Sequence, residues 1–542
     1  MVYTRIGFCS EASFIKNSKY VTKEEVMTMV RSIFLGVVLA AVAAGTSVFA
    51  ETPKRGGTLV FARNMETNTL NPMELADNGQ IYAHELIFDT LAFSDPTGAT
   101  ADLIPGLAES WSVSDDLLQW TFRLRDNARF SDGSSVTSED VQFSFDRFSN
   151  PEINTILPGF YRGYSKTEII DDRNFVVHLD EPIAAFLTNI SVFTAYIVPK
   201  ALVESGGDAF WEAPVGSGPF KVKEWIKGTS ITFERNPYYW EEGKPYLDEL
   251  RYDFIKDDNA RILKLRAGEA DAIESYPWLQ IKMAESMDGV RIQSSEIVRQ
   301  EPLWVNHKVA PLNEVGVRQA LSLATDREAL RAAVFGGVGT IPNHMIPKMQ
   351  FNASTDVVPS FEFNLEKAKA LMAASSVPNG FDVEVQFPAG SSVHKQIATV
   401  MQAHWAEIGV NVNIVGVDET TIQDNLFSYK YEISMPFVKW TSDSTAPDTL
   451  GLLLVDSFTE ASIEGLFSAW ANRDLWDLVD RAVVSDDATR EKLWPEIQAG
   501  WVADMPWINL LWLPGVEGIS DRVHDLHRDA LGVFHFENTW VD

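Results

Sequence analysis

The sequence predicts a protein of the α/β class with two or three domains. Its 542 residues are too many for one ordinary hydrophobic core. Helical and strand patterns alternate along the chain. Residues His394–Ile408 have helical periodicity and are followed directly by Gly409–Val415, which alternates as a strand does. A helix followed by a strand at that spacing is typical of α/β construction.

The first half of the chain carries several strand signals and one clear helix start. Thr137 and Asp140 form a capping-box-like pattern, which predicts a helix running through Phe148 after a turn at Ser131–Gly133. Period-two alternation or short apolar runs predict strands at Gly57–Ala62, Gln119–Leu124, Asn174–Leu179 and Ser230–Phe233.

The second half is richer in helical patterns. A capping box at Thr325–Glu328 lies inside the segment Val315–Phe335 and predicts a break between two helices. Asn364–Ala374 is a further predicted helix. The C-terminal part is aromatic, and we expect these rings to pack in a core: Trp501, Trp507, Trp512, Phe534, Phe536 and Trp540.

The N-terminus has the pattern of a secretory signal peptide. Arg31 precedes the apolar run Ile33–Ala44, and small residues follow as far as Ala50. The run is too short for a transmembrane helix, which needs roughly 20 apolar residues. We therefore expect residues 1–50 to be a leader cleaved after Ala50, with translation starting at Met1, Met27 or Met29. The mature chain of 492 residues, which remains after removal of residues 1–50, is predicted to be exported and soluble.

Composition excludes several classes of function. The formal net charge is −31, so binding to a phosphate backbone is disfavoured. The only cysteine, Cys9, precedes the leader's apolar run, so the mature chain is expected to have no disulfide, no thiol nucleophile and no cysteine metal site. His524 and His527 have a spacing that suits a metal, but no third ligand is evident, and we expect neither a metal nor a cofactor.

Catalytic signatures are mostly missing. Val215–Pro219 fails the spacing of a nucleophile elbow, and no phosphate-binding loop occurs. Ser392 and Lys395 satisfy the Ser-x-x-Lys pattern of penicillin-interacting serine enzymes, but no Lys-Thr-Gly follows. A secreted serine hydrolase using these two residues remains an alternative, and the sequence favours a protein that is not an enzyme.

Several motifs together resemble the extracytoplasmic solute-binding proteins of peptide-type ABC transporters. The strongest likeness lies between residues 103 and 143, where Leu103–Trp111 leads through the predicted strand Gln119–Leu124 to Phe130-Ser-Asp-Gly133 and Thr137–Phe143. Further motifs of the family are Gly56–Leu59, Asn68–Pro72, Gly216–Phe220, Asn236–Trp240, Gly268–Asp271, Val317–Leu321 and Phe534–Asn538.

The resemblance implies a fold. Members of this family have two α/β lobes, with a third small domain inserted in the first lobe. The first lobe is then expected at residues 51–300, the second at 301–512, and the return to the first lobe at 513–542. Asn306 would lie on or near a crossover strand and contact the ligand. Ligand would bind between the lobes, and hinge closure would bury it.

The resemblance also implies a ligand-binding loop. In dipeptide-binding members a Trp-Thr-Gly-Asp loop carries an aspartate that binds the ligand's α-ammonium. Trp440-Thr441-Ser442-Asp443 matches it except for Ser442. A carboxylate with charged hydrogen bonds replaces part of the water that a buried ammonium loses, worth roughly 1.5–3 kcal/mol for each bond. Trp440 would supply a flat wall or a cation–π face, or only pack between lobes.

One feature of the dipeptide binders is missing. They place an arginine for the ligand carboxylate before the helix that aligns with His394–Ile408, and this chain has Pro388-Ala-Gly-Ser-Ser392 there. Ser391, Ser392 and the helix N-terminus would instead bind a polar or anionic ligand end, or Ser391 would only cap the helix. Longer peptides and opine-like amines stay possible.

The leading interpretation is therefore a monomeric periplasmic receptor that delivers a peptide or related amine-bearing nutrient to the permease of an ABC importer. An oligosaccharide receptor on the same fold is the main alternative, since 16 tryptophans would suit stacking on sugars.

Overall fold

The computed structural model describes residues 52–74, 78–94, 103–153, 158–193, 195–297, 299–343, 345, 361–435, 440–441 and 467–542. Lys54–Asp542 forms one compact unit, which holds every element below. The predicted leader, including Arg31 and the cleavage position after Ala50, lies outside the described residues. Within the described ranges, no helix combines the length and the apolar character needed to cross a bilayer.

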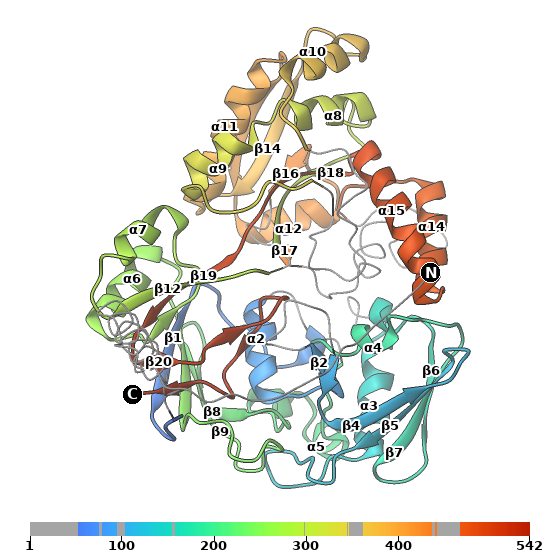
Figure 1. The fold of residues 1–542 in the computed structure, drawn as a ribbon, viewed down its shortest axis with the longest axis vertical. Coiled ribbons are helices and arrows are strands. Elements are labelled where there is room, and N and C mark those ends of the chain that lie inside the picture. The colour runs from blue at the N-terminus through green and yellow to red at the C-terminus, as the bar shows by residue number, and fades with distance from the viewer. Residues whose placement is uncertain are drawn as a thin grey trace, which may run out of the picture. The chain divides into compact units, whose positions relative to one another are not determined.

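A mixed seven-stranded sheet has the order β12-β19-β11-β1-β10-β9-β8 (Figure 1). β1 runs parallel to β10 and β11, and the other pairs are antiparallel. α2 (Asn78–Ile87) contacts β8, and α6 (Asp258–Ala267) contacts β11. The strands are β1 (Thr58–Arg63), β8 (Phe220–Ile226), β9 (Ser230–Arg235), β10 (Glu249–Phe254), β11 (Ala272–Ile273), β12 (Val290–Ser295) and β19 (Gly515–Ser520), and α7 (Ile281–Ala284) packs on β12.

The predicted aromatic core lies partly on this sheet. Phe61, at the centre of β1, packs edge-on against Phe534 and Phe536, with ring centroids 4.9 and 5.6 Å apart. The C-terminal segment reaches the sheet through two short hairpins, which pair β20 (Val523–His524) with β23 (Trp540–Val541) and β21 (His527–Arg528) with β22 (Phe534–His535). Five of the six predicted core rings are buried, and Trp512 is half-buried.

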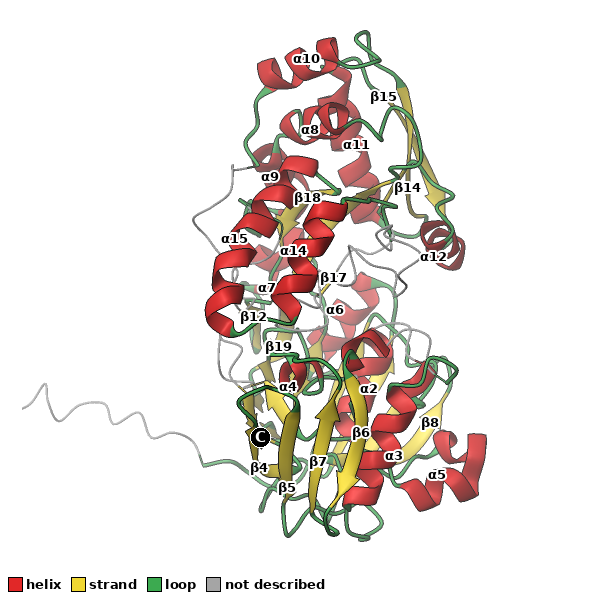
Figure 2. Cartoon of the chain, turned by 90° about the vertical axis from the view of Figure 1, so that its right-hand side faces the viewer, coloured by secondary structure: helices red, strands yellow, loops and turns green. Residues whose placement is uncertain are grey.

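An antiparallel four-stranded sheet forms from residues 108–179, in the order β4-β5-β7-β6. The helix α3 (Ser138–Phe148) packs on β6 (Figure 2) and begins with the predicted capping box, in which Asp140 accepts from the Thr137 N–H at 2.9 Å. The predicted strands and helix of this region are thereby confirmed. The elements are β4 (Ala108–Val113), β5 (Gln119–Leu124), β6 (Tyr164–Ile169) and β7 (Asn174–Leu179), with β2 (Ala92–Ser94), β3 (Leu103–Pro105), α4 (Phe186–Asn189) and α5 (Lys200–Gly206) nearby in the chain.

A six-stranded sheet has the order β15-β14-β16-β13-β17, with β18 also paired to β13. α11 packs on β14 and β15, and α8 and α9 contact β18. Its strands are β13 (Arg299–Val305), β14 (Asp382–Pro388), β15 (Asn411–Val417), β16 (Ile433–Ser434), β17 (Trp440–Thr441) and β18 (Trp507–Trp512). The helices are α8 (Val315–Leu323), α9 (Arg327–Phe335), α10 (Leu365–Ala374), α11 (Ser392–Ala406), α12 (Glu419–Phe427), α14 (Arg473–Val483) and α15 (Asp487–Asp504).

The predicted break inside residues 315–335 is confirmed, with a different capping residue. α8 ends at Leu323 and α9 begins at Arg327. The side chain that caps α9 is Asp326, which accepts from the Ala329 N–H at 2.9 Å, while the Thr325 hydroxyl donates back to the Leu321 carbonyl. Asp and Thr are both good N-caps, and the backbone of residue 326 has the extended conformation that an N-cap requires.

The chain passes between the two large sheets twice. β12 belongs to the seven-stranded sheet and β13 to the six-stranded sheet, and β18 and β19 make the return. The strand membership therefore changes between residues 295 and 299 and again between 512 and 515. The expected lobe limits, 51–300, 301–512 and 513–542, fall at or beside these changes and stay a prediction.

Candidate functional site

A buried ion pair lies where two neighbouring parallel strands of the seven-stranded sheet end. β1 ends at Arg63, and Glu274 directly follows β11. Arg63 Nε donates to a Glu274 carboxylate oxygen at 3.0 Å, and both side chains are at most 4% exposed. The guanidinium also lies over the rings of Tyr82 and Tyr252. Ligands of open α/β sheets bind outside the carboxyl ends of the strands, so this edge is a candidate for ligand contact.

A second buried pair lies beside the first. Arg528 on β21 and Glu517 on β19 form an ion pair in which both side chains are fully buried. Arg528 Nη2 also donates to the Tyr82 hydroxyl at 3.2 Å. Burial opposes the charge of Arg528, but Glu517 and Tyr82 outweigh burial and raise the Arg528 pKa above its ordinary value. Tyr82 therefore touches an arginine of each pair.

A third arginine joins this group from the other sheet. Arg299 is the first residue of β13 and is 2% exposed. Burial, and then the like charge of Arg528, lower the Arg299 pKa to about 10, against attraction from Tyr82, Glu517 and Glu274. Arg299 therefore stays charged at neutral pH. We call these six residues the crossing cluster: Arg63, Tyr82, Glu274, Arg299, Glu517 and Arg528.

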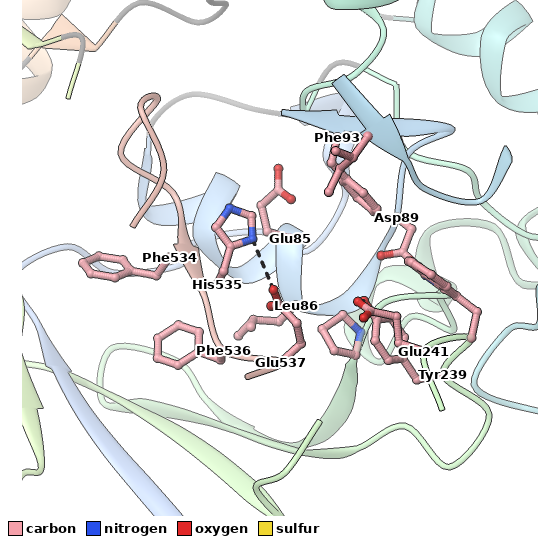
Figure 3. A pocket seen from close by; sticks show the side chains of 13 residues that line it. Glu85, Leu86, Asp89, Phe93, Tyr239, Glu241, Phe534, His535, Phe536 and Glu537 are labelled. Carbon is pink, nitrogen blue, oxygen red and sulfur yellow. Dashed lines mark hydrogen bonds and ion pairs between the residues drawn. The ribbon is translucent and has the colours of Figure 1, made fainter. Parts of the chain in front are cut away.

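A pocket of about 560 Å³, part of it open to solvent, lies between α2, residues 239–241 and the C-terminal segment 534–537 (Figure 3). Four carboxylates and one imidazole stand among apolar side chains. The lining residues are Glu85, Leu86, Asp89, Phe93, Ile104, Pro219, Tyr239, Trp240, Glu241, Phe534, His535, Phe536 and Glu537.

The titrating groups of this pocket are strongly perturbed. Burial raises the pKa of Glu85 to about 7, against the opposing effect of His535. Burial also raises the pKa of Asp89 well above its usual value, although Trp240 Nε1 donates to its carboxylate at 3.1 Å. For His535 burial lowers the pKa, but Asp529 and the nearby glutamates outweigh it and raise the pKa to about 9. Burial thus favours the neutral forms of Glu85 and Asp89, while His535 stays charged, so the pocket combines apolar walls with carboxyl groups and one cation.

The predicted ammonium-binding loop begins at β17. This strand runs antiparallel to the start of β13, with Trp440 opposite Gln300 and Thr441 opposite Arg299. The chain therefore leaves Thr441 beside the passage from β12 to β13. The side chains of Trp440 and Thr441, and all of Ser442 and Asp443, lie outside what the structure describes. Their ligand roles stay predictions.

Asn306 directly follows β13, as expected, but its amide is fully engaged with the backbone. The side chain is fully buried, and Nδ2 donates to the carbonyls of Tyr429 and Tyr431 at 2.9 and 2.7 Å. Oδ1 accepts from the Lys308 N–H at 2.9 Å. These bonds favour a structural role, in which Asn306 holds the turn between α12 and β16, over ligand contact.

Ser391 and Ser392 form the start of α11. Ser391 is the N-cap, and its hydroxyl accepts from the His394 N–H at 3.3 Å. Ser392 is the first helical residue. The helix-capping interpretation of Ser391 is the one that this geometry favours, and an anion at this N-terminus stays a prediction.

The two histidines near the C-terminus have other contacts. His524 Nε2 lies 3.1 Å from an Asp542 carboxylate oxygen, and its ring stacks on Trp540 at 3.8 Å between centroids. Among the described residues, no three potential ligand side chains gather closely enough to hold a metal ion.

Sequence reasoning did not find the crossing cluster. A local signal exists, because Arg63 ends the apolar run Leu59–Ala62 and Glu517 lies inside the mostly buried strand Gly515–Ser520. A charged residue inside a buried strand needs a partner. The partner of Arg63 is Glu274, more than 200 residues away, and the partner of Glu517 is Arg528 on a separate hairpin. The local pattern alone therefore does not identify these partners.

Comparison with known proteins assigns the class. The family described as "Bacterial extracellular solute-binding proteins, family 5 Middle" matches residues 102–460. A dipeptide-binding protein of Escherichia coli is 27% identical over 537 residues, covering 94% of this chain and 98% of that protein.

Two solved structures extend the likeness. The ABC transporter-associated periplasmic binding protein DppA of Helicobacter pylori, in complex with peptide STSA, is 25% identical with a TM-score of 0.80, covering 90% of this chain and 98% of that one. The binding protein AgaA of A. tumefaciens, in complex with agropinic acid, is 27% identical with a TM-score of 0.79, covering 90% and 99%.

The chain belongs to the family 5 bacterial extracellular solute-binding proteins. It has their two-lobed α/β fold and works by binding a solute. The alternative of a secreted serine hydrolase is therefore excluded, and Ser392 with Lys395 is a chance match to the enzyme pattern.

Proposed function

We propose that this protein is the periplasmic receptor of an ABC importer and captures a peptide or a related amine-bearing nutrient. The relatives support the ligand class, since they include a dipeptide-binding protein and a protein holding peptide STSA. The observation that carries the proposal is the place of β17. Its pairing with Arg299 and Gln300 starts the Trp440–Asp443 loop at the passage between the two large sheets.

In this proposal Asp443 binds the ammonium group of the solute. A closed cleft removes water from the ammonium, and a paired carboxylate replaces part of that hydration. Leaving either charge buried alone costs several kcal/mol, so the site rejects solutes without a cation.

The remaining parts of the proposal concern the whole protein. Cleavage after Ala50 releases a periplasmic, monomeric receptor. Residues 51–300 and 513–542 form one lobe and residues 301–512 the other. The lobes close around the solute by a hinge motion at the two strand passages, and the closed form delivers it to the permease in the inner membrane.

The first test is native mass spectrometry of the mature chain purified without denaturation, followed by release of any bound small molecule. A co-purified peptide or other amine supports the proposal and names the ligand class. A bound oligosaccharide, or a carboxylate without an amine, keeps the receptor and refutes the role of Asp443.

The second test compares Asp443→Ala with Asp443→Asn on the ligand so identified, by titration calorimetry. We expect both variants to bind at least about tenfold more weakly, because each lacks the negative charge and one charged hydrogen bond is worth roughly 1.5–3 kcal/mol. The apo melting temperature is the control and stays nearly unchanged. Wild-type affinity in Asp443→Asn would show that Asp443 is a turn residue.

A further inference from the structure

The strongest unexplained feature of the described residues is the guanidinium of Arg299. It is 2% exposed, and Nε is buried with no hydrogen-bond partner. Across the described part of the chain, no hydrogen bond or ion pair involves this guanidinium. A buried charge without a partner costs several kcal/mol. Such a group calls for an anion that the described part of the chain does not supply.

The other two arginines of the crossing cluster each form an ion pair with a buried carboxylate. Arg63 has Glu274 as its partner, and Arg528 has Glu517. The crossing cluster therefore holds three guanidinium groups and two carboxylates, and the excess positive charge is that of Arg299. The like charge of Arg528 makes the environment of Arg299 still more favourable to an incoming anion.

The position of Arg299 connects this charge to solute binding. Its backbone opens β13 directly after the passage from the seven-stranded sheet, and it pairs with Thr441. Its side chain is close enough to Tyr82 on α2, Glu274 after β11 and Glu517 on β19 for these groups to act on its charge. Arg299 thus lies where the proposed ammonium-binding loop begins and where the parallel strands end.

We propose that Arg299 is the residue that binds the carboxylate of the solute. A guanidinium presents paired N–H donors that match the two oxygens of a carboxylate. The arginine that dipeptide binders carry before the helix beginning at Ser392 is missing here, and Arg299 supplies the same charge from β13. The solute class becomes a zwitterion with an ammonium and a carboxylate group. The inference depends on the proposed function only for the statement that the solute carries an ammonium group.

The first test needs no identified ligand. Apo wild type, Arg299→Met and Arg327→Met are melted in sodium acetate at constant ionic strength. Arg299→Met alone should leave the apo melting temperature unchanged or raise it, because it removes an unpaired buried charge. Arg327→Met is the matched control: this buried guanidinium donates to the carbonyls of Asn509 and Ser322, so its loss should lower the melting temperature. Acetate should raise the melting temperature of wild type and of Arg327→Met but not of Arg299→Met.

The second test uses a pool of tripeptides with free carboxyl termini and the same pool amidated at the C-terminus, with binding read by native mass spectrometry. We expect wild type to prefer the free acids at least about tenfold, and Arg299→Met to lose that preference. Retention of the preference in Arg299→Met overturns the role of Arg299 and leaves the proposed function standing. If neither pool binds wild type, the peptide proposal fails. The role of Arg299 then depends on the first test: an equal change of melting temperature with acetate in wild type and in Arg299→Met overturns the inference.

Discussion

Replacing Asn306 tests whether this residue holds the fold or the ligand. Its three polar bonds all run to the backbone, to the carbonyls of Tyr429 and Tyr431 and from the N–H of Lys308. Tyr429 has a positive φ of 55°, which an ordinary side chain rarely adopts. The amide of Asn306 therefore stabilises a strained turn between α12 and β16. We expect Asn306→Ala to weaken the apo fold and to leave the affinity of the folded protein for its solute intact.

The size of the effect follows from the bonds that are lost. Three hydrogen bonds contribute about 1 kcal/mol each, and a buried group left unpaired costs about 1–3 kcal/mol more. The free energy of unfolding should then fall by about 4–6 kcal/mol. For a lobe of roughly 200 residues, that corresponds to a melting temperature lower by roughly 8–24 °C.

Urea unfolding of the apo protein, followed by tryptophan fluorescence, measures the change. Asn306→Asp is the matched variant: it keeps the acceptor for the Lys308 N–H but turns a carboxylate toward two carbonyl oxygens. Asn306→Asp should be at least as unstable as Asn306→Ala at neutral pH and recover partly in acid, where the protonated acid regains one donor. A wild-type urea midpoint in Asn306→Ala together with lost affinity would refute the structural role and make Asn306 a ligand residue.

Three further predictions address the pocket, the helix start and the hinge. The folded pKa of His535 is raised from 6.5 to about 9, so its stabilisation is complete below pH 6.5 and is lost as the pH rises through about 9. Wild type should lose up to roughly 3 kcal/mol of unfolding free energy over that window, and His535→Gln should have a flatter profile; identical profiles would contradict this linkage. Ser391→Ala should cost about 1 kcal/mol and Ser391→Gly a few tenths, with solute affinity unchanged in both, whereas a tenfold loss of affinity would make Ser391 a ligand contact. Addition of the solute identified by native mass spectrometry should reduce the radius of gyration in small-angle scattering, and an unchanged profile would count against hinge closure.

The elements that sequence patterns predicted correctly are those held by contacts between near neighbours. The α3 capping box joins Thr137 to Asp140 within one helical turn, and β5 follows its alternation over Gln119–Leu124 without an error at either end. Where two neighbouring residues can both cap a helix, the sequence pattern does not show which of them does so. Thr325 and Asp326 are both capable N-caps, and only the backbone shows that Asp326 is the one used.

The residues of the candidate site likewise differ in whether local sequence or distant contacts determine their role. The motif Trp440–Asp443 is contiguous, so a resemblance can identify it, and the structure adds that β17 pairs with the start of β13. The role of Asn306 depended on contacts with residues more than 120 positions away, and the sequence alone left its amide open to a ligand.

The sequence by itself determined the α/β class, most of the local elements and, through its ordered motifs, the family of extracellular solute-binding proteins. Only the tertiary structure decided how charge is arranged at the strand passages. Arg63, Glu274, Glu517 and Arg528 are scattered over more than 450 positions, and the sheet order brings them together. Whether a buried arginine is satisfied depends on which carboxylates surround it in space, and no local pattern records that. Arg299 therefore became a candidate for solute binding only when its neighbours were seen to be paired with each other.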